Sequence, residues 1–194
     1  ARALFGRAKL DHGSISVAGR RLRHAGPASA RRAGIAYVPE SRRSMLFQQE
    51  PVYKNTSISI LGRLSALFLK PAQERLLAQR QIERLNIRPP RPEAALGALS
   101  GGNQQKVALA KWLTYPPKVL VLSEPTRGMD VGAKDEVVRI VRSLREQGLA
   151  VVIMSAEPET VLSMADRIVV LRKGEVVREF AGEVVSKDRL LEAA

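Results

Sequence analysis

The most informative part of the sequence is Leu99-Ser100-Gly101-Gly102-Asn103-Gln104-Gln105-Lys106, followed by the apolar run Val119-Leu120-Val121-Leu122 and by Ser123-Glu124-Pro125-Thr126. A small polar residue and two glycines at the start of a helix leave backbone N–H groups open at its positive end, which favours an anionic phosphate. The apolar run predicts a strand buried on both faces. Such a strand delivers an acidic residue to the sheet edge where ligands of open α/β folds bind.

The segments around this stretch predict an α/β fold in which strands and helices alternate. Short apolar runs predict strands at residues 13–19, 35–39, 119–122, 149–154, 168–171 and 175–180. We expect 149–154 and 168–171 to be buried strands and 175–180 to close a hairpin. Helical spacing and caps predict one helix that ends near residue 6. They predict four further helices, at residues 100–113, 134–147, 158–164 and 186–194. This alternation is typical of a parallel sheet covered by helices.

For two of these helices the sequence also predicts the caps and the buried face. Helix 100–113 should begin at the N-cap Ser100 and bury its apolar residues, including the single tryptophan, Trp112. Helix 134–147 should end at Gly148 and carry an Asp135/Arg139 pair on its outer face. Its inward face should consist of Val137, Ile140, Val141 and Leu144.

Residues 51–99 differ in character and predict a small helical lobe. One helical face gathers Ile60, Leu64, Leu67 and Phe68, and another gathers Ala78, Ile82 and Leu85. Lys70-Pro71 and the cluster Pro89-Pro90-Arg91-Pro92 separate the helices.

Composition limits the classes of protein that the chain can belong to. Its 194 residues are 45% hydrophobic, enough for one substantial core, and no apolar run is long enough to span a membrane. The absence of cysteine excludes disulfides and thiolate metal sites, and it fits a reducing cytosol. The net charge of +13 is spread over pairs such as Arg20-Arg21, with 4% aromatic residues. This pattern favours a solvated basic surface, with attraction to anionic lipid or ATP as the alternative.

Taken together, LSGGNQQK and VLVLSEPTRGMD resemble the signature motif, Walker B strand, catalytic glutamate and D-loop of the ATP-binding cassette (ABC) family. The segment EPTRGMDVGAK is most similar to the second cassette of the tandem ATPases of bacterial monosaccharide or autoinducer-type importers. The resemblance implies a P-loop NTPase-like three-layer α/β sandwich with a mostly parallel sheet and a helical subdomain. Residues 1–50 and 100–194 would form the core with β hairpins, and residues 51–99 the helical subdomain.

The resemblance also implies the roles of individual residues. Ser100, Gly101 and Gly102 would bind the γ-phosphate of ATP held by a partner cassette, supported by the helix that Asn103 and Gln104 begin. Glu124 would be the general base that orients the attacking water. The remaining nucleotide-binding positions would be Asp130 in the D-loop and Glu40 in the Q-loop, and the Mg²⁺ contacts would come from Glu40 and, weakly and through water, Ser123. For Glu40, a plain surface turn is the competing interpretation.

The chain departs from the family pattern at three places. No segment matches the Walker A pattern G-x-x-x-x-G-K-[ST], so we expect a partial cassette that lacks its P-loop strand and binds ATP weakly by itself. The missing strand should leave unpaired backbone and a tendency to associate. Ser123 stands where the family has the Mg²⁺-binding aspartate, and Ala156 where it has the switch histidine. Both changes predict slow hydrolysis at this site.

These resemblances imply an ABC-type ATPase, an energy-coupling subunit of a bacterial sugar-type importer that uses ATP and Mg²⁺. Its expected partners are a second cassette, transmembrane permease subunits that the helical lobe would contact and, indirectly, a periplasmic substrate-binding protein. Its expected place is the cytoplasmic face of the inner membrane. One alternative is a degenerate cassette that clamps ATP without hydrolysing it. A weaker one, prompted by the net charge, is a soluble cassette protein acting on nucleic acid or ribosomes, although no nucleic-acid partner is expected.

Overall fold

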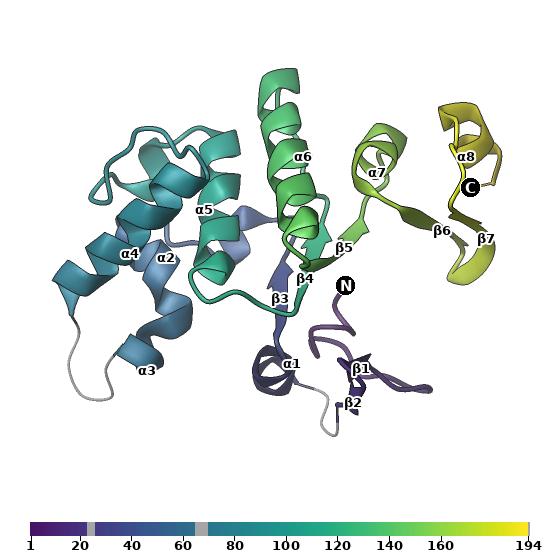
Figure 1. Cartoon of the computed structure of the whole chain (residues 1–194), viewed down its shortest axis with the longest axis horizontal. Helices are drawn as coiled ribbons and strands as arrows, with labels where there is room; N and C mark the ends of the chain where they lie inside the picture. The colour runs from purple at the N-terminus through teal and green to yellow at the C-terminus, as the bar shows by residue number, and fades with distance from the viewer. Residues whose placement is uncertain (23–25, 65–69, 194) are drawn as a thin grey trace.

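A three-stranded parallel sheet lies at the centre of the computed structural model, which describes residues 1–22, 26–64 and 70–193 (Figure 1). The strands are β3 (Ile35–Val38), β4 (Val119–Ser123) and β5 (Ala150–Met154), in the order β3-β4-β5. Val121 pairs with Tyr37 on one side and with Val152 on the other. The prediction of a parallel sheet around the buried run 119–122 is therefore confirmed.

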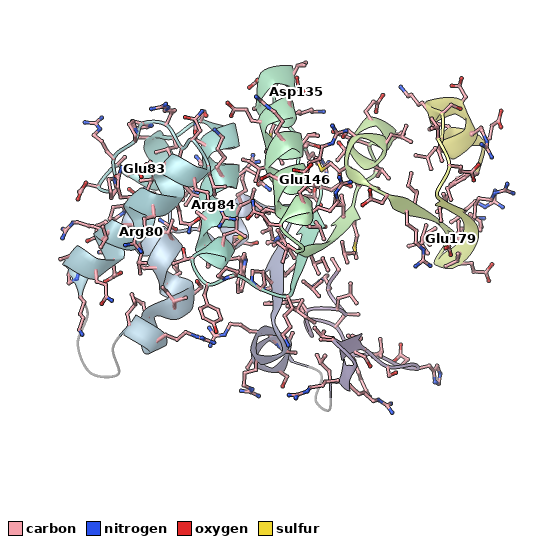
Figure 2. All side chains as sticks on the ribbon, in the orientation of Figure 1. Arg80, Glu83, Arg84, Asp135, Glu146 and Glu179 are labelled. Atoms are coloured by element: carbon pink, nitrogen blue, oxygen red, sulfur yellow. The ribbon has the colours of Figure 1, made fainter. Side chains whose placement is uncertain are left out.

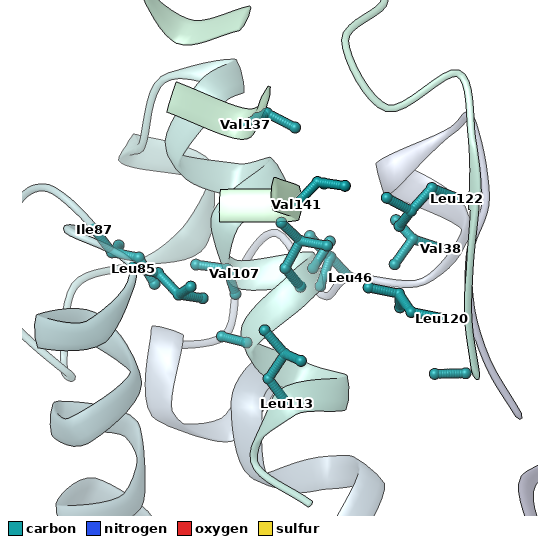
Figure 3. Packing of buried hydrophobic residues seen from close by; sticks show 14 of the residues in the cluster. Val38, Leu46, Leu85, Ile87, Val107, Leu113, Leu120, Leu122, Val137 and Val141 are labelled. Carbon is teal, nitrogen blue, oxygen red and sulfur yellow. The ribbon is translucent and has the colours of Figure 1, made fainter. Parts of the chain in front are cut away.

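Side chains of the central strands alternate between two apolar layers, as the period of two requires. Leu120 and Leu122 point into the main core, which α5 (Gly101–Leu113) and α6 (Val131–Glu146) cover on the same face (Figure 3). Val121 joins the second cluster on the opposite face with Phe5 and Tyr37. The two clusters and the sheet between them give the three layers expected of the fold.

Trp112 joins the two layers, but it is half-buried rather than fully buried. Its ring packs against both apolar clusters, and its indole N–H donates to the carbonyl of Tyr37 over 3.0 Å. The position at the end of α5 and beside the sheet edge explains the partial exposure, because no further strand of the described chain covers β3 on that side.

The N-terminal segment forms a small lobe under the sheet (Figure 1). It contains β1 (Ser16–Val17), β2 (Arg20–Arg21) and α1 (Pro27–Ala33). The predicted helix tail before residue 6 is only a turn, although the N–H groups of Gly6 and Arg7 bond to the carbonyls of Ala3 and Arg2 as at a helix end. A Cβ on Gly6 would lie 2.5 Å from the backbone of Gly26, so glycine permits this close packing.

Residues 51–99 form the predicted helical lobe. Its helices are α2 (Val52–Ser57), α3 (Leu61–Leu64) and α4 (Pro71–Arg84), with short 3₁₀ turns at Ile58–Ile60 and Leu96–Ala98. Another 3₁₀ turn, Arg42–Ser44, precedes the lobe. Of the two predicted apolar faces, Ile60, Ala78, Ile82 and Leu85 are buried and Leu64 is half-buried, whereas Leu67 and Phe68 lie outside the described residues. The lobe packs on the sheet layer through contacts of α2 and α4 with α5.

The C-terminal part consists of α7 (Pro158–Met164), β6 (Arg167–Arg172), β7 (Glu175–Ala181) and α8 (Lys187–Ala193). The prediction that 168–171 is a buried strand is wrong. Among the described strands β6 pairs with β7 alone, in an antiparallel hairpin, and it buries Ile168 and Val170 while exposing Val169 and Leu171. Alternating burial follows because one face of this hairpin meets α8 and the other meets solvent.

The strand β5 is also less buried than predicted, since its residues from Val151 to Met154 are half-buried. Among the described strands β5 pairs only with β4, so its second edge has no ladder partner in this part of the chain. This open edge is consistent with the expected unpaired backbone. The tendency to associate stays a prediction.

Helix α6 begins earlier than predicted, at Val131, because Asp130 caps it. The expected Asp135/Arg139 side-chain pair is wrong. The Arg139 side chain donates through Nε to the backbone carbonyl of Asp135 at 3.4 Å, and Figure 2 shows Asp135 on the outer surface of the helix. An exposed pair gains too little free energy to hold two solvated side chains together.

No helix within the described ranges combines the length and apolar character needed to cross a membrane.

Candidate phosphate-binding site

Three polar residues follow the carboxyl ends of the three parallel strands. Glu40 lies just after β3, Glu124 directly after β4, and Ser155 directly after β5. Because parallel strands end at one edge of the sheet, these loops are neighbours. The backbone N–H of Glu124 donates to the carbonyl of Met154 at 2.8 Å, which ties two of these loops together.

Ser100 caps α5 as predicted. Its hydroxyl oxygen accepts hydrogen bonds from the N–H and the side-chain amide of Asn103, at 3.4 and 3.0 Å. The Asn103 side-chain oxygen in turn accepts the N–H of Arg88 at 2.8 Å, so the helix start is anchored to the helical lobe. The Gln104 side chain donates to the carbonyl of Leu99 at 2.9 Å. The side chains of Asn103 and Gln104 thus organise the turn, and their contribution to phosphate binding would come through the helix backbone.

The first N–H groups of α5 are those of Gly101 and Gly102. An α-helix leaves its first N–H groups without intrahelical partners, and within the described part of the chain Ser100 satisfies only that of Asn103. Ser100 and Gly101 are exposed to solvent. Two backbone donors therefore remain for an anion at the positive end of this helix.

Arg42 adds a cationic group that the sequence reasoning did not assign to this site. A Cβ built on Gly101 would lie 3.4 Å from Nη2 of Arg42. The guanidinium therefore stands beside the N–H groups of the helix start, where it favours a phosphate. No signal in the linear sequence separates Arg42 from the neighbouring arginine, because the contact depends on how the turn after β3 meets α5.

Gly102 brings the starts of α5 and α6 together. A Cβ at this position would lie 2.9 Å from the Cβ of Ala133, so only glycine allows the two helices to approach this closely. Asp130 caps α6 through its Oδ1, which accepts the N–H of Ala133 at 2.9 Å. The structure thus places the two predicted nucleotide-binding segments, at Ser100 and at Asp130, next to each other.

Glu124 is held by the loop after β5. One carboxylate oxygen accepts the hydroxyl of Ser155 at 2.7 Å, and the other accepts the N–H of Ala156 at 2.8 Å. Glu124 itself adopts a left-handed backbone with φ of 48°, which is unusual for a residue with a side chain. Strain of this kind persists only where the surroundings enforce it. Ser155 is thus a second residue of this site that sequence reasoning missed.

A second carboxylate, Glu157, links three neighbouring segments. Its Oε2 accepts hydrogen bonds from Lys134 at 2.9 Å, from Thr160 at 3.0 Å and from the buried Thr126 at 3.3 Å. The ammonium of Lys134 and the hydroxyl donors lower the pKa of the Glu157 carboxyl below its ordinary value. This carboxylate connects the start of α6 with the loops after β4 and β5.

Replacing Glu157 by glutamine is expected to lower the free energy of unfolding by about 1 kcal/mol near neutral pH. The depressed pKa means that the charged carboxylate stabilises the folded state above the ordinary value of 4.5, and this stabilisation disappears as pH falls through the lowered pKa. Urea unfolding at neutral and acidic pH should therefore show a difference between Glu157→Gln and the parent chain that shrinks in acid. The exposed Glu146, changed to glutamine, serves as the control, and a pH-independent difference would contradict the prediction.

The predicted Mg²⁺ contacts at Glu40 and Ser123 stay a prediction. The Glu40 carboxylate pairs with the Arg127 guanidinium, and Ser123 ends β4 with a neutral hydroxyl. Among the residues that the structure describes, no three His, Cys, Asp or Glu side chains form a cluster that could hold a metal ion. Mg²⁺ prefers several oxygen ligands, which these residues do not supply by themselves.

Comparison with known proteins gives consistent results. A family model described as "ABC transporter" matches residues 1–127. The chain is 41% identical over 196 aligned residues to the putative ribose/galactose/methyl galactoside import ATP-binding protein 3 of Agrobacterium fabrum, covering 100% of the chain and 39% of that protein. It is 42% identical to the ribose import ATP-binding protein RbsA 2 of Rubrobacter xylanophilus, covering 100% of the chain and 38% of that protein. The chain thus spans about two fifths of the length of these relatives.

A solved structure shares the fold. An ATP-binding cassette described as a dimeric post-hydrolysis state bound to ADP and Pi superposes with a TM-score of 0.76 at 19% sequence identity. The match covers 93% of this chain and 78% of the other. The prediction of a P-loop NTPase-like α/β fold is therefore confirmed.

Proposed function

The chain belongs to the ABC transporter family of ATPases, and from this premise we propose that it is one ATP-binding cassette of a longer protein that powers a bacterial sugar importer. Its sugar class is suggested by relatives whose names refer to ribose and galactose import. In this proposal Ser100, Gly101 and Gly102 contact the γ-phosphate of an ATP bound to a partner cassette.

The observation that carries the proposal is the open start of α5. The N–H groups of Gly101 and Gly102 lie at the positive end of a helix, and the Arg42 guanidinium stands beside Gly101. Asp130 at the start of α6 lies close to the same place through the contact of Gly102 with Ala133. This arrangement suits a triphosphate that approaches from outside the chain, because Ser100 and Gly101 are exposed.

Glu124 is the proposed general base. Hydrogen bonds from Ser155 and from the N–H of Ala156 orient its carboxylate, and each oxygen keeps a lone pair to accept a proton from water. The water oxygen then attacks, in line, the γ-phosphorus of the ATP at this cassette's own nucleotide site. The bond to the β,γ-bridging oxygen breaks, and ADP leaves. In this scheme the backbone N–H of Ala156 supports the base directly, although the alanine side chain cannot contact phosphate as the family's histidine does.

A second candidate function has specific observations in its favour. Ser123 supplies no charge for Mg²⁺, and Ala156 supplies no imidazole. A cassette with these residues could clamp ATP for its partner and pass motion to the permease without hydrolysing ATP itself. The effect of Glu124→Gln on turnover separates the two functions and is treated in the Discussion.

We further propose that the helical lobe contacts transmembrane permease subunits at the cytoplasmic face of the inner membrane. The lobe is built on α2 and α4, which pack against each other and on α5. Asn103 ties the start of α5 to Arg88 of the lobe, so displacement of the lobe would move the phosphate-binding N–H groups. A periplasmic substrate-binding protein would act through the permease.

Hydrogen exchange of the full-length protein tests the proposal. Trapping the protein with ATP and vanadate should slow exchange of the amides of Gly101 and Gly102, because a phosphate would accept their hydrogen bonds. The amides of the exposed segment around Gly174 serve as the control and should not change. Unchanged exchange at Gly101 and Gly102 in the trapped state would contradict the proposed contact.

A further inference from the structure

The N-terminal lobe concentrates positive charge. Residues 1–34 contain eight Lys or Arg side chains and a single acidic one, Asp11, so they carry more than half of the net charge of +13. Seven of the eight lie in the described ranges, and all seven are exposed. These seven residues, called the basic lobe below, are Arg2, Arg7, Lys9, Arg20, Arg21, Arg31 and Arg32.

The charges of the basic lobe are not neutralised within the described chain. Between α6 and α8, by contrast, basic side chains pair with carboxylates, as in Arg145–Asp166, Arg167–Glu179 and Lys187–Glu159. In the described ranges, no ion pair involves a member of the basic lobe. Figure 2 shows side chains ending in nitrogen that project outward from the segments around α1, β1 and β2. Such a surface attracts a partner rich in phosphate.

A cavity of about 470 Å³ lies next to the turn between β1 and β2, which Arg20 and Arg21 of the basic lobe follow. Ala18, in the turn between β1 and β2, forms one wall. The floor is apolar and includes Leu113 at the end of α5 and Leu144 near the end of α6, both nearly completely buried. Pro116, Pro117 and Leu149 complete the apolar lining. The cavity therefore accepts a hydrocarbon group rather than a polar one.

Cationic side chains line the mouth of this cavity. Arg84, labelled in Figure 2, donates through Nη2 to Oε1 of Gln147 at 2.6 Å. Lys118 packs its aliphatic stem against Gly34 at the end of α1, where a Cβ would lie 2.9 Å from the Lys118 side chain. Lys118 thus joins the mouth of the cavity to the end of α1 that carries Arg31 and Arg32. An apolar cavity bordered by cations is complementary to an amphipathic anion.

We infer that this face binds the anionic phospholipids of a membrane, with lipid phosphates on the basic lobe and the end of an acyl chain in the cavity. Nucleic acid would be attracted by the same charges, but it gains affinity by stacking bases on aromatic rings. Phe5 and Tyr37 are buried in the core, so they offer no stacking surface. The exposed Tyr115, which precedes the cavity-lining Pro116, is covered by the Arg63 guanidinium at 3.7 Å from the ring centroid. The inference is independent of the phosphate site at α5, which lies at the opposite ends of α5 and α6.

Cosedimentation of the full-length protein with lipid vesicles tests the inference. We expect binding to phosphatidylglycerol vesicles and little binding to phosphatidylcholine vesicles, with affinity falling as salt rises. The double variant Arg20→Gln/Arg21→Gln should bind about tenfold more weakly or worse. Gln147→Glu should also weaken binding, because a carboxylate beside Arg84 neutralises the mouth of the cavity.

The matched control is Arg172→Gln/Lys173→Gln, which removes the same charge from an exposed turn far along the chain and should bind as the parent does. Soluble dihexanoyl phosphatidylglycerol should compete with the vesicles, whereas inorganic phosphate at the same concentration should not. Equal losses in the two double variants, or no effect of Gln147→Glu, would overturn the inference. Binding of duplex DNA in preference to vesicles would overturn it in favour of nucleic acid.

Discussion

Replacing Gly101 by aspartate is expected to lower ATP hydrolysis by the full-length protein about 100-fold or more, while the variant stays folded at least as stably as the parent. The carboxylate would stand where the γ-phosphate is proposed to bind, so it repels the nucleotide. A negative side chain in the first turn of a helix also stabilises that helix by about 0.3–1 kcal/mol. The nearby Arg42 guanidinium would add a partner for the new charge.

A loss of hydrolysis together with unchanged stability would separate an effect on function from an effect on folding. There is space for a side chain at Gly101, because a Cβ there would meet only the Arg42 guanidinium within 4 Å, at 3.4 Å and beyond. At Gly102, by contrast, any side chain would press on Ala133, and a loss of activity could reflect misfolding. Gly62→Asp is the matched control, since it adds the same charge on α3, where a Cβ would have no neighbour within 4 Å among the described residues. Steady-state hydrolysis and thermal unfolding are the measurements. Parental turnover in Gly101→Asp would rule out the phosphate contact.

Replacing Glu124 by glutamine is expected to lower turnover about 100-fold to 1,000-fold without weakening ATP binding, if this site hydrolyses ATP. The amide cannot accept the proton of the attacking water, but it preserves the shape of the side chain. Its oxygen can still accept the N–H of Ala156, and its NH₂ can donate to the hydroxyl of Ser155. The left-handed backbone at this position is no worse for glutamine than for glutamate.

The comparison must be made within the full-length protein, with the equivalent substitution introduced separately in the partner cassette. Single-turnover hydrolysis and equilibrium ATP binding are measured for each variant, and Glu146→Gln on the outer end of α6 is the control. A loss of turnover from Glu124→Gln alone supports catalysis at this site. Unaltered turnover would reject Glu124 as the base and favour the clamping function suggested by Ser123 and Ala156.

Local sequence features predicted most of the elements correctly because they depend on neighbouring residues. The continuous apolar run 119–122 predicts a buried central strand, and Ser100 predicts the helix start that it caps. Where the predictions were wrong, long-range contacts decided. Val169 and Leu171 look as buried in the sequence as Val121 does, yet β6 meets β7 instead of the central sheet. A short apolar run does not reveal which strand it will pair with.

The same distinction applies to the candidate site. The motif residues Ser100, Gly101 and Glu124 could be chosen from the sequence. Glycines at a helix start and a carboxylate after a buried strand indicate a ligand site from neighbouring residues alone. Their supporting residues had no such signal. Ser155 and Glu157 are ordinary polar residues of a loop until β4 and β5 pair, which brings them to Glu124 and Lys134.

Residue type and spacing along the chain were enough to predict the class of fold, the start of α5 with its open N–H groups and the substitutions at Ser123 and Ala156. Three further features arise only when the chain has folded: Arg42 stands beside Gly101, Ser155 holds Glu124, and an apolar cavity lies next to the turn that precedes Arg20 and Arg21. The physical reason is that these contacts join residues far apart in sequence, and their geometry exists only after the sheet and the helices have packed.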